Sequence, residues 1–185
     1  MNSEKAQRIC PVERAGGLDH PVRRFLQHPR KILKPYIRPG MTVLDLGCGP
    51  GFFTFEMAKM LQHHGEVIAA DVQQGMLDIV SRKIRASGLE SLISLHLCGE
   101  DRIGLDRAVD FVLAFYMVHE VKDKAKLFHE LKSLLKPGGL LCIVEPNFHV
   151  SRASFAGMLD MAAQFGLRVV ERPGVFFSRS VILSN

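Results

Sequence analysis

A glycine-rich loop between an apolar strand and a helix constrains this chain more than any other feature. Residues 43–52 read VLDLGCGPGF, with glycines at positions 47, 49 and 51. Glycine adds no side chain and tolerates positive φ, so a small charged ligand can lie directly against the backbone of such a loop. A helix that begins after the loop adds unpaired N–H groups and a partial positive charge. The pattern predicts a ligand-binding turn at the end of a buried strand.

Apolar runs alternate with segments of helical period along most of the chain. The expected strands are 42–46, 66–71, 92–97, 110–115, 140–145, 167–171 and 175–183, and the expected helices are 52–61, 75–86, 123–135 and 151–165. This alternation predicts an α/β fold, a mostly parallel sheet with helices on both faces. Only residues 172–174 separate the last two expected strands, which is too short for a parallel crossover, so we expect an antiparallel hairpin there.

The composition is that of one folded domain. The chain has 185 residues, of which 47% are hydrophobic and 23% charged. No apolar run approaches the roughly 20 residues that cross a bilayer, and residues 1–10 lack a signal-peptide core. We therefore expect a cytoplasmic protein without membrane contact. The four cysteines form no CxxC pair, so we expect no metal site and reduced, structural cysteines.

The positive charge is concentrated at the N-terminus. Residues 1–40 contain nine Lys and Arg against three Asp and Glu, whereas the rest of the chain is nearly neutral. We divide the chain into a basic cap or lid segment, residues 1–30, and one domain, residues 31–185. A basic segment attracts anionic partners, including nucleic acid. Its only aromatic residues up to position 40 are Phe25 and Tyr36, which is poor for base stacking, so we favour a solvated cap.

Several nucleotide-binding patterns do not fit the loop. A GxGxxG motif starting at Gly47 requires glycine where Phe52 stands, and no Gly-Lys-Ser/Thr occurs. Asp71 follows Gly51 by 20 residues and fits an acid that accepts hydrogen bonds from ribose hydroxyls. Asp45 beside the loop suits a ligand with a cationic amino-acid end and repels a pyrophosphate. NAD and ATP are therefore disfavoured.

Taken together, the motifs resemble the class I S-adenosylmethionine-dependent methyltransferases. VLDLGCGPG is similar to the first motif of that family, IAADV supplies the acid after the second strand, and LCGED occupies the adenine-contacting segment. DFVLAFYMVHEV resembles the fourth strand and LKPGGLLCIVEP the segment after it. The resemblance covers residues 30–185 and is nearest to the group with the ubiquinone/menaquinone-biosynthesis and arsenite methyltransferases. It implies a Rossmann-like seven-stranded sheet of order 3-2-1-4-5-7-6, with S-adenosyl-L-methionine as cofactor.

The resemblance also implies which residues hold the cofactor. Those near its methionine end and methyl group are Asp45, Gly47, Cys48, Gly49, Gly51 and Phe115. Those near its adenosine are Asp71, Val72, Met76, Gly99, Glu100 and Asp101. Family members often have Gly-Asp after the third strand, whereas this chain has Gly-Glu-Asp. Either of the two acids would then accept the adenine amine.

Candidate catalytic residues follow the fourth strand. Tyr116, His119 and Glu120 are the candidates there, and Glu145 and His149 follow the fifth strand at the same edge. His119 is the natural base, because histidine titrates near pH 6.5. The alternative is that the His-Glu pair only caps the next helix. No large insertion follows the fifth strand, so residues 1–30 would cover the acceptor.

Three functions remain open at this point. The favoured one is methyl transfer to a small-molecule acceptor by in-line displacement. The second is RNA methylation guided by the basic N-terminus, which steep salt dependence of binding would reveal. The third is a non-catalytic module that senses S-adenosylmethionine. The residues define neither the acceptor nor the oligomeric state.

Overall fold

The computed structural model describes residues 27–185, and one sheet with its covering helices makes up this part of the chain. Its strands are β1 (Thr42–Leu46), β2 (Glu66–Asp71), β3 (Ile93–Leu97), β4 (Val109–Phe115), β5 (Leu135–Pro146), β6 (Arg168–Glu171) and β7 (Ser178–Ser184). Its helices are α3 (Pro29–Leu33), α4 (Thr54–Met60), α5 (Gln74–Arg85), α6 (Lys124–Leu134) and α7 (Arg152–Gln164), with a 3₁₀ turn, η2, at Val118–Glu120.

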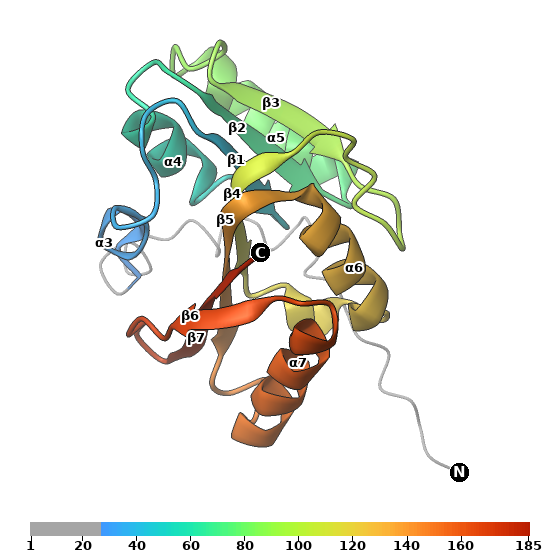
Figure 1. The fold of residues 1–185 in the computed structure, drawn as a ribbon. Coiled ribbons are helices and arrows are strands. Elements are labelled where there is room, and N and C mark those ends of the chain that lie inside the picture. The colour runs from blue at the N-terminus through green and yellow to red at the C-terminus, as the bar shows by residue number, and fades with distance from the viewer. Residues whose placement is uncertain (1–26) are drawn as a thin grey trace.

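The strand order is β3-β2-β1-β4-β5-β7-β6, which Figure 1 shows as one twisted sheet. The first five strands pair in parallel, and β7 lies antiparallel to both β5 and β6. The predicted α/β fold, its strand order and its antiparallel last strand are confirmed. The termini of β1 and β2 agree with the expected bounds because each strand begins after a turn and ends at an acid or a glycine.

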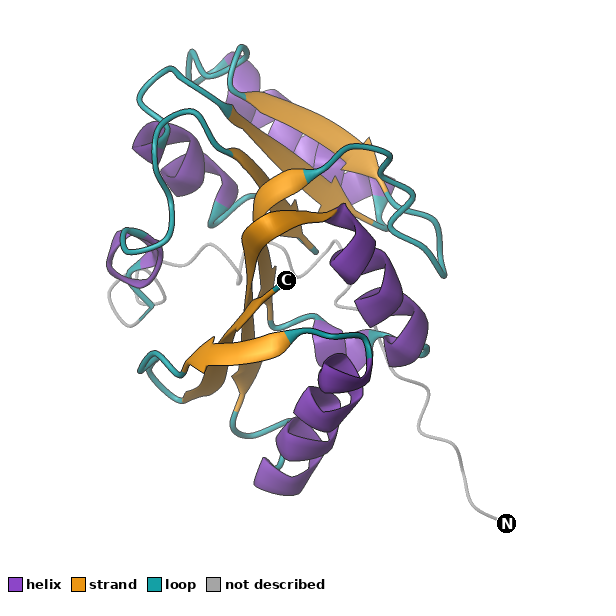
Figure 2. Cartoon of the chain, viewed as in Figure 1, coloured by secondary structure: helices purple, strands orange, loops and turns teal. Residues whose placement is uncertain are grey.

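Helices cover both faces of the sheet (Figure 2). Successive side chains of a strand point to opposite faces, so Val43 packs with α3, α4 and α5, whereas Leu44 packs with α6 and α7. Side chains of β4 from Phe111 to Ala114 are fully buried. Burial on both faces explains why this strand is an unbroken apolar run rather than an alternating one.

The start of β5 differs from the expectation. The expected helix ended at 135 and the expected strand began at 140, but β5 begins at Leu135. Val109 pairs with Leu135 and Phe111 with Leu140, so the intervening segment is a bulge within the strand. Gly138 has a φ of +75° there, a conformation that favours glycine. Residues 136–139 therefore interrupt the pairing with β4, which is present before them at Leu135 and after them at Leu140.

The last hairpin also differs. Its loop spans residues 172–177 rather than 172–174, because β7 begins at Ser178. Phe177 has a φ of +51°, and the Ser178 N–H donates to the Val175 carbonyl at 3.1 Å. Residues 175–177, which were expected to begin the last strand, therefore belong to the turn.

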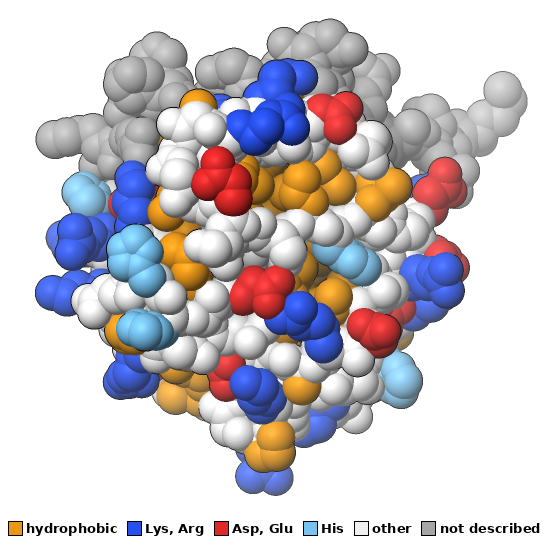
Figure 3. Space-filling model, turned by 90° about the horizontal axis from the view of Figure 1, so that it is seen from above, with side chains coloured by type: hydrophobic (Ala, Val, Ile, Leu, Met, Phe, Trp, Pro, Cys, Tyr) orange, Lys and Arg blue, Asp and Glu red, His pale blue; other side chains and the backbone are white. Residues whose placement is uncertain are grey.

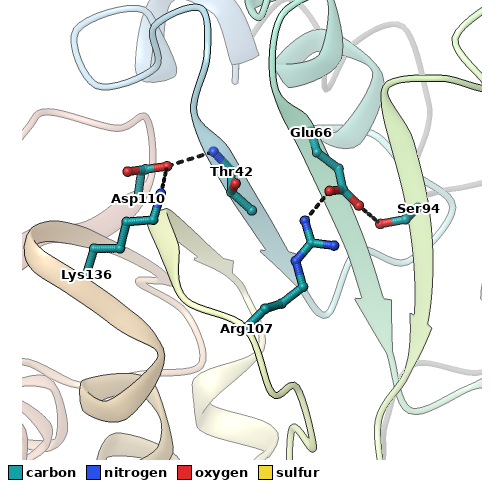
Figure 4. A network of polar contacts seen from close by, with 6 residues as sticks. All are labelled: Thr42, Glu66, Ser94, Arg107, Asp110 and Lys136. Carbon is teal, nitrogen blue, oxygen red and sulfur yellow. Dashed lines mark hydrogen bonds and ion pairs between the residues drawn. The ribbon is translucent and has the colours of Figure 1, made fainter.

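Polar contacts hold the strands together at the amino-terminal edge of the parallel sheet (Figure 4). Asp110 Oδ2 accepts hydrogen bonds from the Thr42 N–H and from Lys136 Nζ, both at 2.8 Å. Glu66 likewise accepts from side chains of β3 and of the loop before β4. Asp110 therefore orders the start of the fourth strand.

Three cysteines lie in the described residues. Cys48, Cys98 and Cys142 are buried and unpaired, as expected, whereas Cys10 lies outside the described range, as do Phe25 and nearly all of the segment 1–30. Between residues 27 and 185, no helix is long and apolar enough to cross a membrane. The same residues contain no group of three or more side chains suited to a metal ion.

Candidate functional site

The carboxyl ends of β1, β2 and β4 meet at one edge of the sheet. β1 pairs with β2 on one side and with β4 on the other, so the segments that follow these strands are neighbours. The glycine loop, the segment after Asp71 and the segment from Tyr116 to Glu120 are brought together there. This is the place where open α/β sheets bind ligands.

The backbone of the glycine loop could not accept larger residues. Gly47, Gly49 and Gly51 have φ values of +71°, +53° and +88°. A Cβ on the first of them would lie 2.9 Å from the Met117 Cβ, and one on the third would lie 2.8 Å from the Phe55 ring. Gly47 is therefore packed against the residues after β4 and Gly51 against α4, with no room for a side chain at either position.

Asp71 joins the loop to the end of β2. Its Oδ2 accepts the Gly49 N–H and its Oδ1 accepts the Gln73 N–H, both at 2.9 Å. The side chain is only 6% exposed. Burial raises the pKa of this carboxyl, although the backbone N–H bonds act in the opposite direction. Each carboxylate oxygen can accept a second hydrogen bond, so the group is oriented to receive a pair of hydroxyls.

Asp45 lies below the loop on the side of α4. It is 3% exposed, and its Oδ2 accepts the Thr54 hydroxyl at 2.6 Å. The carboxylate is thus tied to the first residue of α4. Cys48, also in the loop, is buried, and burial together with the charges of Asp45 and Asp71 raises the pKa of its thiol. This cysteine is therefore a neutral packing residue.

The predicted adenosine side shows both exposed and buried residues. Val72 is 42% exposed, and the sequence reasoning missed a second apolar side chain nearby, Leu97, which is 51% exposed. Leu97 pairs with Asp71 across β2 and β3, and this register is the signal that could have found it. Met76 of α5 is 1% exposed.

The two candidate acids after β3 have different surroundings. Asp101 forms an ion pair with Lys126 of α6 at 2.7 Å, so its carboxylate faces that helix. Glu100 is exposed. Gly99 forms a bridge with Arg102, which makes this segment a tight turn. Contact with an adenine amine stays a prediction for both acids.

Aromatic side chains line the end of β4. Phe115 packs with Phe53 at a ring distance of 4.3 Å and with Tyr116 at 4.4 Å. Tyr116 has a φ of +60°, which is uncommon for a bulky residue and is often found at functional sites. Its hydroxyl lies 2.6 Å from the Ser178 Oγ and accepts a hydrogen bond from Gln27. The side chain thus bridges the chain before α3 and β7.

His119 and Glu145 form the most distinctive pair at this edge. His119 Nδ1 lies 2.5 Å from Glu145 Oε2, and the His119 backbone N–H donates to Oε1 of the same carboxylate at 3.2 Å. The Glu145 side chain is fully buried, whereas that of His119 is 23% exposed. The His149 ring stacks on His119 at 5.6 Å. A strand-end acid thus holds the histidine that follows the neighbouring strand.

The charges around His119 decide its ionisation. Burial lowers its pKa, but the hydrogen bond and charge of Glu145, together with the charge of Glu120, outweigh burial and raise the pKa above its usual value. Burial raises the pKa of Glu120, and the charges of Glu145 and Asp71 add to that effect while His119 opposes it.

The alternative interpretation of His119 and Glu120 as helix caps is wrong. The N-cap of α6 is Asp123, whose side chain accepts the Lys126 N–H at 2.9 Å. The histidine instead donates Nδ1–H to a carboxylate, because an ionised carboxylate can only accept. In neutral His119 the other nitrogen, Nε2, is then the basic one.

Known proteins resemble this chain in sequence and in fold. A family model described as a methyltransferase domain matches residues 37–166. The solved structure of a SAM-dependent methyltransferase from Aquifex aeolicus superposes with a TM-score of 0.85 at 30% identity, over 95% of this chain and 99% of that one. A putative S-adenosyl-L-methionine-dependent methyltransferase from Methanococcus maripaludis has a TM-score of 0.79 at 18% identity, over 100% of this chain and 97% of that one, and supports the fold alone.

Two curated relatives have similar sequences. A demethylmenaquinone methyltransferase from Symbiobacterium thermophilum is 28% identical over 83% of this chain and 66% of its own length. A ubiquinone/menaquinone biosynthesis C-methyltransferase, UbiE, from Shewanella oneidensis is 32% identical over 62% of this chain and 47% of its own length. The matched region thus spans between about half and two thirds of these relatives.

Proposed function

This chain belongs to the class I S-adenosylmethionine-dependent methyltransferases, and we propose that it transfers a methyl group from that cofactor to a small-molecule acceptor. The observation that carries the proposal is the juxtaposition of two groups at one sheet edge. Asp71, anchored by the backbone of the glycine loop, lies on one side, and His119, held by Glu145, lies on the other. One group suits a ribose and the other suits a proton-losing nucleophile.

The residues present fit the cofactor of the family. The Gly49 N–H orients the Asp71 carboxylate, and a carboxylate can accept two ribose hydroxyls at once. The exposed side chains of Val72 and Leu97 offer apolar walls for an adenine ring. When bound, the cofactor supplies a methyl group activated by a sulfonium. We propose that Asp45 and residues 47–51 hold its methionine end.

On the acceptor side, the protein must orient the nucleophile and exclude water, which supplies much of the rate enhancement in such reactions. We propose that His119 Nε2 takes the proton that the acceptor loses. Glu145 would keep the imidazole in the required tautomer and stabilise its protonated form. Tyr116, which is fixed by Ser178, and Glu120 would border the acceptor.

The curated relatives suggest which acceptors to test first. Their names specify demethylmenaquinone, ubiquinone and menaquinone biosynthesis, so a quinone-type ring is the first candidate for this chain. RNA methylation is less favoured. Basic and acidic side chains are interspersed on the face of the described residues in Figure 3, whereas RNA binding generally uses a continuous basic surface. A cytoplasmic location stays a prediction.

Methyl transfer can be tested with labelled cofactor. The protein is incubated with S-adenosylmethionine carrying a labelled methyl group, together with demethylated quinones, a small-molecule extract or total RNA. The proposal predicts label in the small-molecule fraction and equimolar S-adenosylhomocysteine. Label in RNA alone would favour the second function, and cofactor binding without any product would favour the sensor.

A matched pair of variants tests the role of His119. His119→Gln removes the base and should lower turnover while leaving the binding of S-adenosylhomocysteine unchanged. His129→Gln, a histidine on α6 that packs edge-on with Phe165, is the control and should leave turnover unaltered. Equal turnover of the two variants would contradict the assignment of His119.

A further inference from the structure

A cavity of about 290 Å³ lies between α7 and the β6–β7 hairpin, outside the residues assigned to methyl transfer. Three arginines from different segments line it. Arg152 comes from the first turn of α7, Arg172 from the hairpin loop and Arg179 from β7. Figure 1 shows that α7 and the hairpin lie side by side at one end of the sheet.

None of the three guanidinium groups forms an ion pair within residues 27–185. Glu171 is next to Arg172 in the chain, but its carboxylate accepts the Tyr36 hydroxyl. No acidic side chain lines the cavity. Three arginines line one cavity that has no acidic side chain among its lining residues, and this excess of positive charge favours occupation by an anion.

Arg179 has one hydrogen-bonded and one unsatisfied guanidinium nitrogen. Its Nη1 donates to Asn147 Oδ1 at 2.8 Å, which fixes the guanidinium. Its Nε is buried and has no hydrogen-bond partner among the described residues. A buried N–H without an acceptor is unfavourable and uncommon in folded proteins.

The remaining walls limit the kind of ligand. Phe155 and Leu159 of α7 are buried apolar residues that form one side, and the Ser180 hydroxyl, which donates to the Pro173 carbonyl, lies near the other. Guanidinium groups bind carboxylates and phosphates through paired N–H donors in a planar fork. The cavity thus combines an anion-binding side with an apolar side.

We propose that this cavity binds the carboxylate or phosphate group of a small organic molecule. The proposal rests on the arginine contacts and does not depend on methyl transfer. The site is nevertheless close to the acceptor side, because Arg179 pairs with Glu145 across β5 and β7. A ligand anchored there lies one strand away from the carboxylate that holds His119.

Calorimetric titration of the full chain with inorganic phosphate and, separately, with benzoate tests the proposal. We expect saturable binding of at least one of the two anions at a single site, and the probe that binds more tightly distinguishes a phosphate ligand from a carboxylate ligand. Arg179→Gln and Arg172→Gln should each weaken that binding at least about tenfold, because each removes a charge-assisted hydrogen bond.

The control variant is Arg168→Gln, which removes the same charge from the other end of the hairpin, where Arg168 pairs with Ser184. It should bind the anion within about twofold of the natural protein, as a local site requires. The proposal fails if neither anion binds saturably, if the Arg172 and Arg179 variants bind like the natural protein, or if Arg168→Gln weakens binding equally.

The thermal shift produced by S-adenosylhomocysteine separates this site from the proposed function. Arg172 is exposed, so its variant should fold and retain the full shift while it loses anion binding. If Arg179→Gln does not fold, the Arg172 variant alone decides the question. A protein that binds the anion but does not respond to S-adenosylhomocysteine would support the cavity and contradict the cofactor assignment.

Discussion

Replacing Asp71 by asparagine should abolish most of the response to cofactor while leaving the fold nearly as stable as before. The carboxylate accepts two backbone N–H bonds and, in the proposed complex, two ribose hydroxyls. Asparagine has only one acceptor oxygen. Its NH₂ group takes the place of the other carboxylate oxygen and cannot accept the hydrogen bonds donated to that position. One charge-assisted hydrogen bond to the ribose, about 2 kcal/mol, is then lost, which weakens cofactor binding about 30-fold.

The stability of the unliganded variant follows from two opposing effects. Burial raises the pKa of the Asp71 carboxyl, so the ionised form is disfavoured in the folded protein. Stability therefore falls as the pH rises through the interval from the unfolded pKa, about 3.8–3.9, to the higher folded pKa. Asparagine removes this penalty at pH 7 but loses one backbone hydrogen bond. We expect a net change in unfolding free energy of less than about 1 kcal/mol.

Differential scanning fluorimetry with S-adenosylhomocysteine measures both quantities. At a concentration 100 times its dissociation constant, the ligand should stabilise the natural protein by about 2.7 kcal/mol, which is about 5–11 °C in Tm for a domain of this size. The same concentration is only about three times the dissociation constant of Asp71→Asn. The variant should gain about 0.9 kcal/mol, or about 2–3 °C.

Asp110→Asn is the matched control, because it makes the same chemical change at the opposite edge of the sheet. It weakens the contacts with Thr42 and Lys136, so its unliganded Tm should fall while its ligand shift stays at the natural value. The reasoning is refuted if Asp71→Asn retains the full shift, or if both variants lose it equally.

The remaining predictions concern the acceptor side, the loop and the core. Because Glu145 and Glu120 outweigh burial and Lys124 and raise the pKa of His119, the rate should increase as the pH rises through a value above 6.5. Glu145→Gln should lower that apparent pKa and reduce turnover at least about tenfold, whereas an unshifted pH–rate profile would contradict the pairing. The same raised pKa stabilises the fold at low pH and loses this contribution as the pH rises through it, which urea titrations at pH 5.5 and 8.5 can detect. Gly51→Ala should lower Tm, since its Cβ would lie 2.8 Å from a ring carbon at a φ of +88°, and unchanged melting would show that the loop can shift. Phe128→Ala should destabilise the domain by about 3–5 kcal/mol in urea unfolding, because this side chain of α6 is fully buried in the core; a loss below about 1 kcal/mol would argue against that packing.

The fold could be predicted from the sequence because local signals and global topology agree. The glycine loop, the acid after β2 and the unbroken apolar run of β4 each mark a strand end or a buried strand, and the structure confirms the strand order. The errors lie where pairing overrides composition. β5 continues through a glycine bulge, and a left-handed residue at Phe177 delays β7. A single sequence shows neither pairing register nor φ.

The candidate site was predictable in its residue types and not in its contacts. The spacing between the loop and Asp71 predicted that they act together, and the structure places them in hydrogen-bond contact. Which strand-end residue holds His119 depends on how β4 and β5 align. The exposure of Leu97 depends on the position of β3 at the edge of the sheet. The three arginines that line the cavity between α7 and the β6–β7 hairpin are separated in the sequence, and the packing of α7 against the hairpin brings them together.

The sequence by itself therefore determined the architecture and the class of cofactor, because periodicity, glycine spacing and strand-end acids act over short chain distances. Only the tertiary structure decided which charged side chains lie close to one another. Glu145 and His119, or Arg152 and Arg179, are separated by more than 20 residues, and their pairing depends on strand register and helix packing. Electrostatic effects act through space rather than along the chain, so the sequence-predicted loop required the folded sheet before its neighbours could be identified.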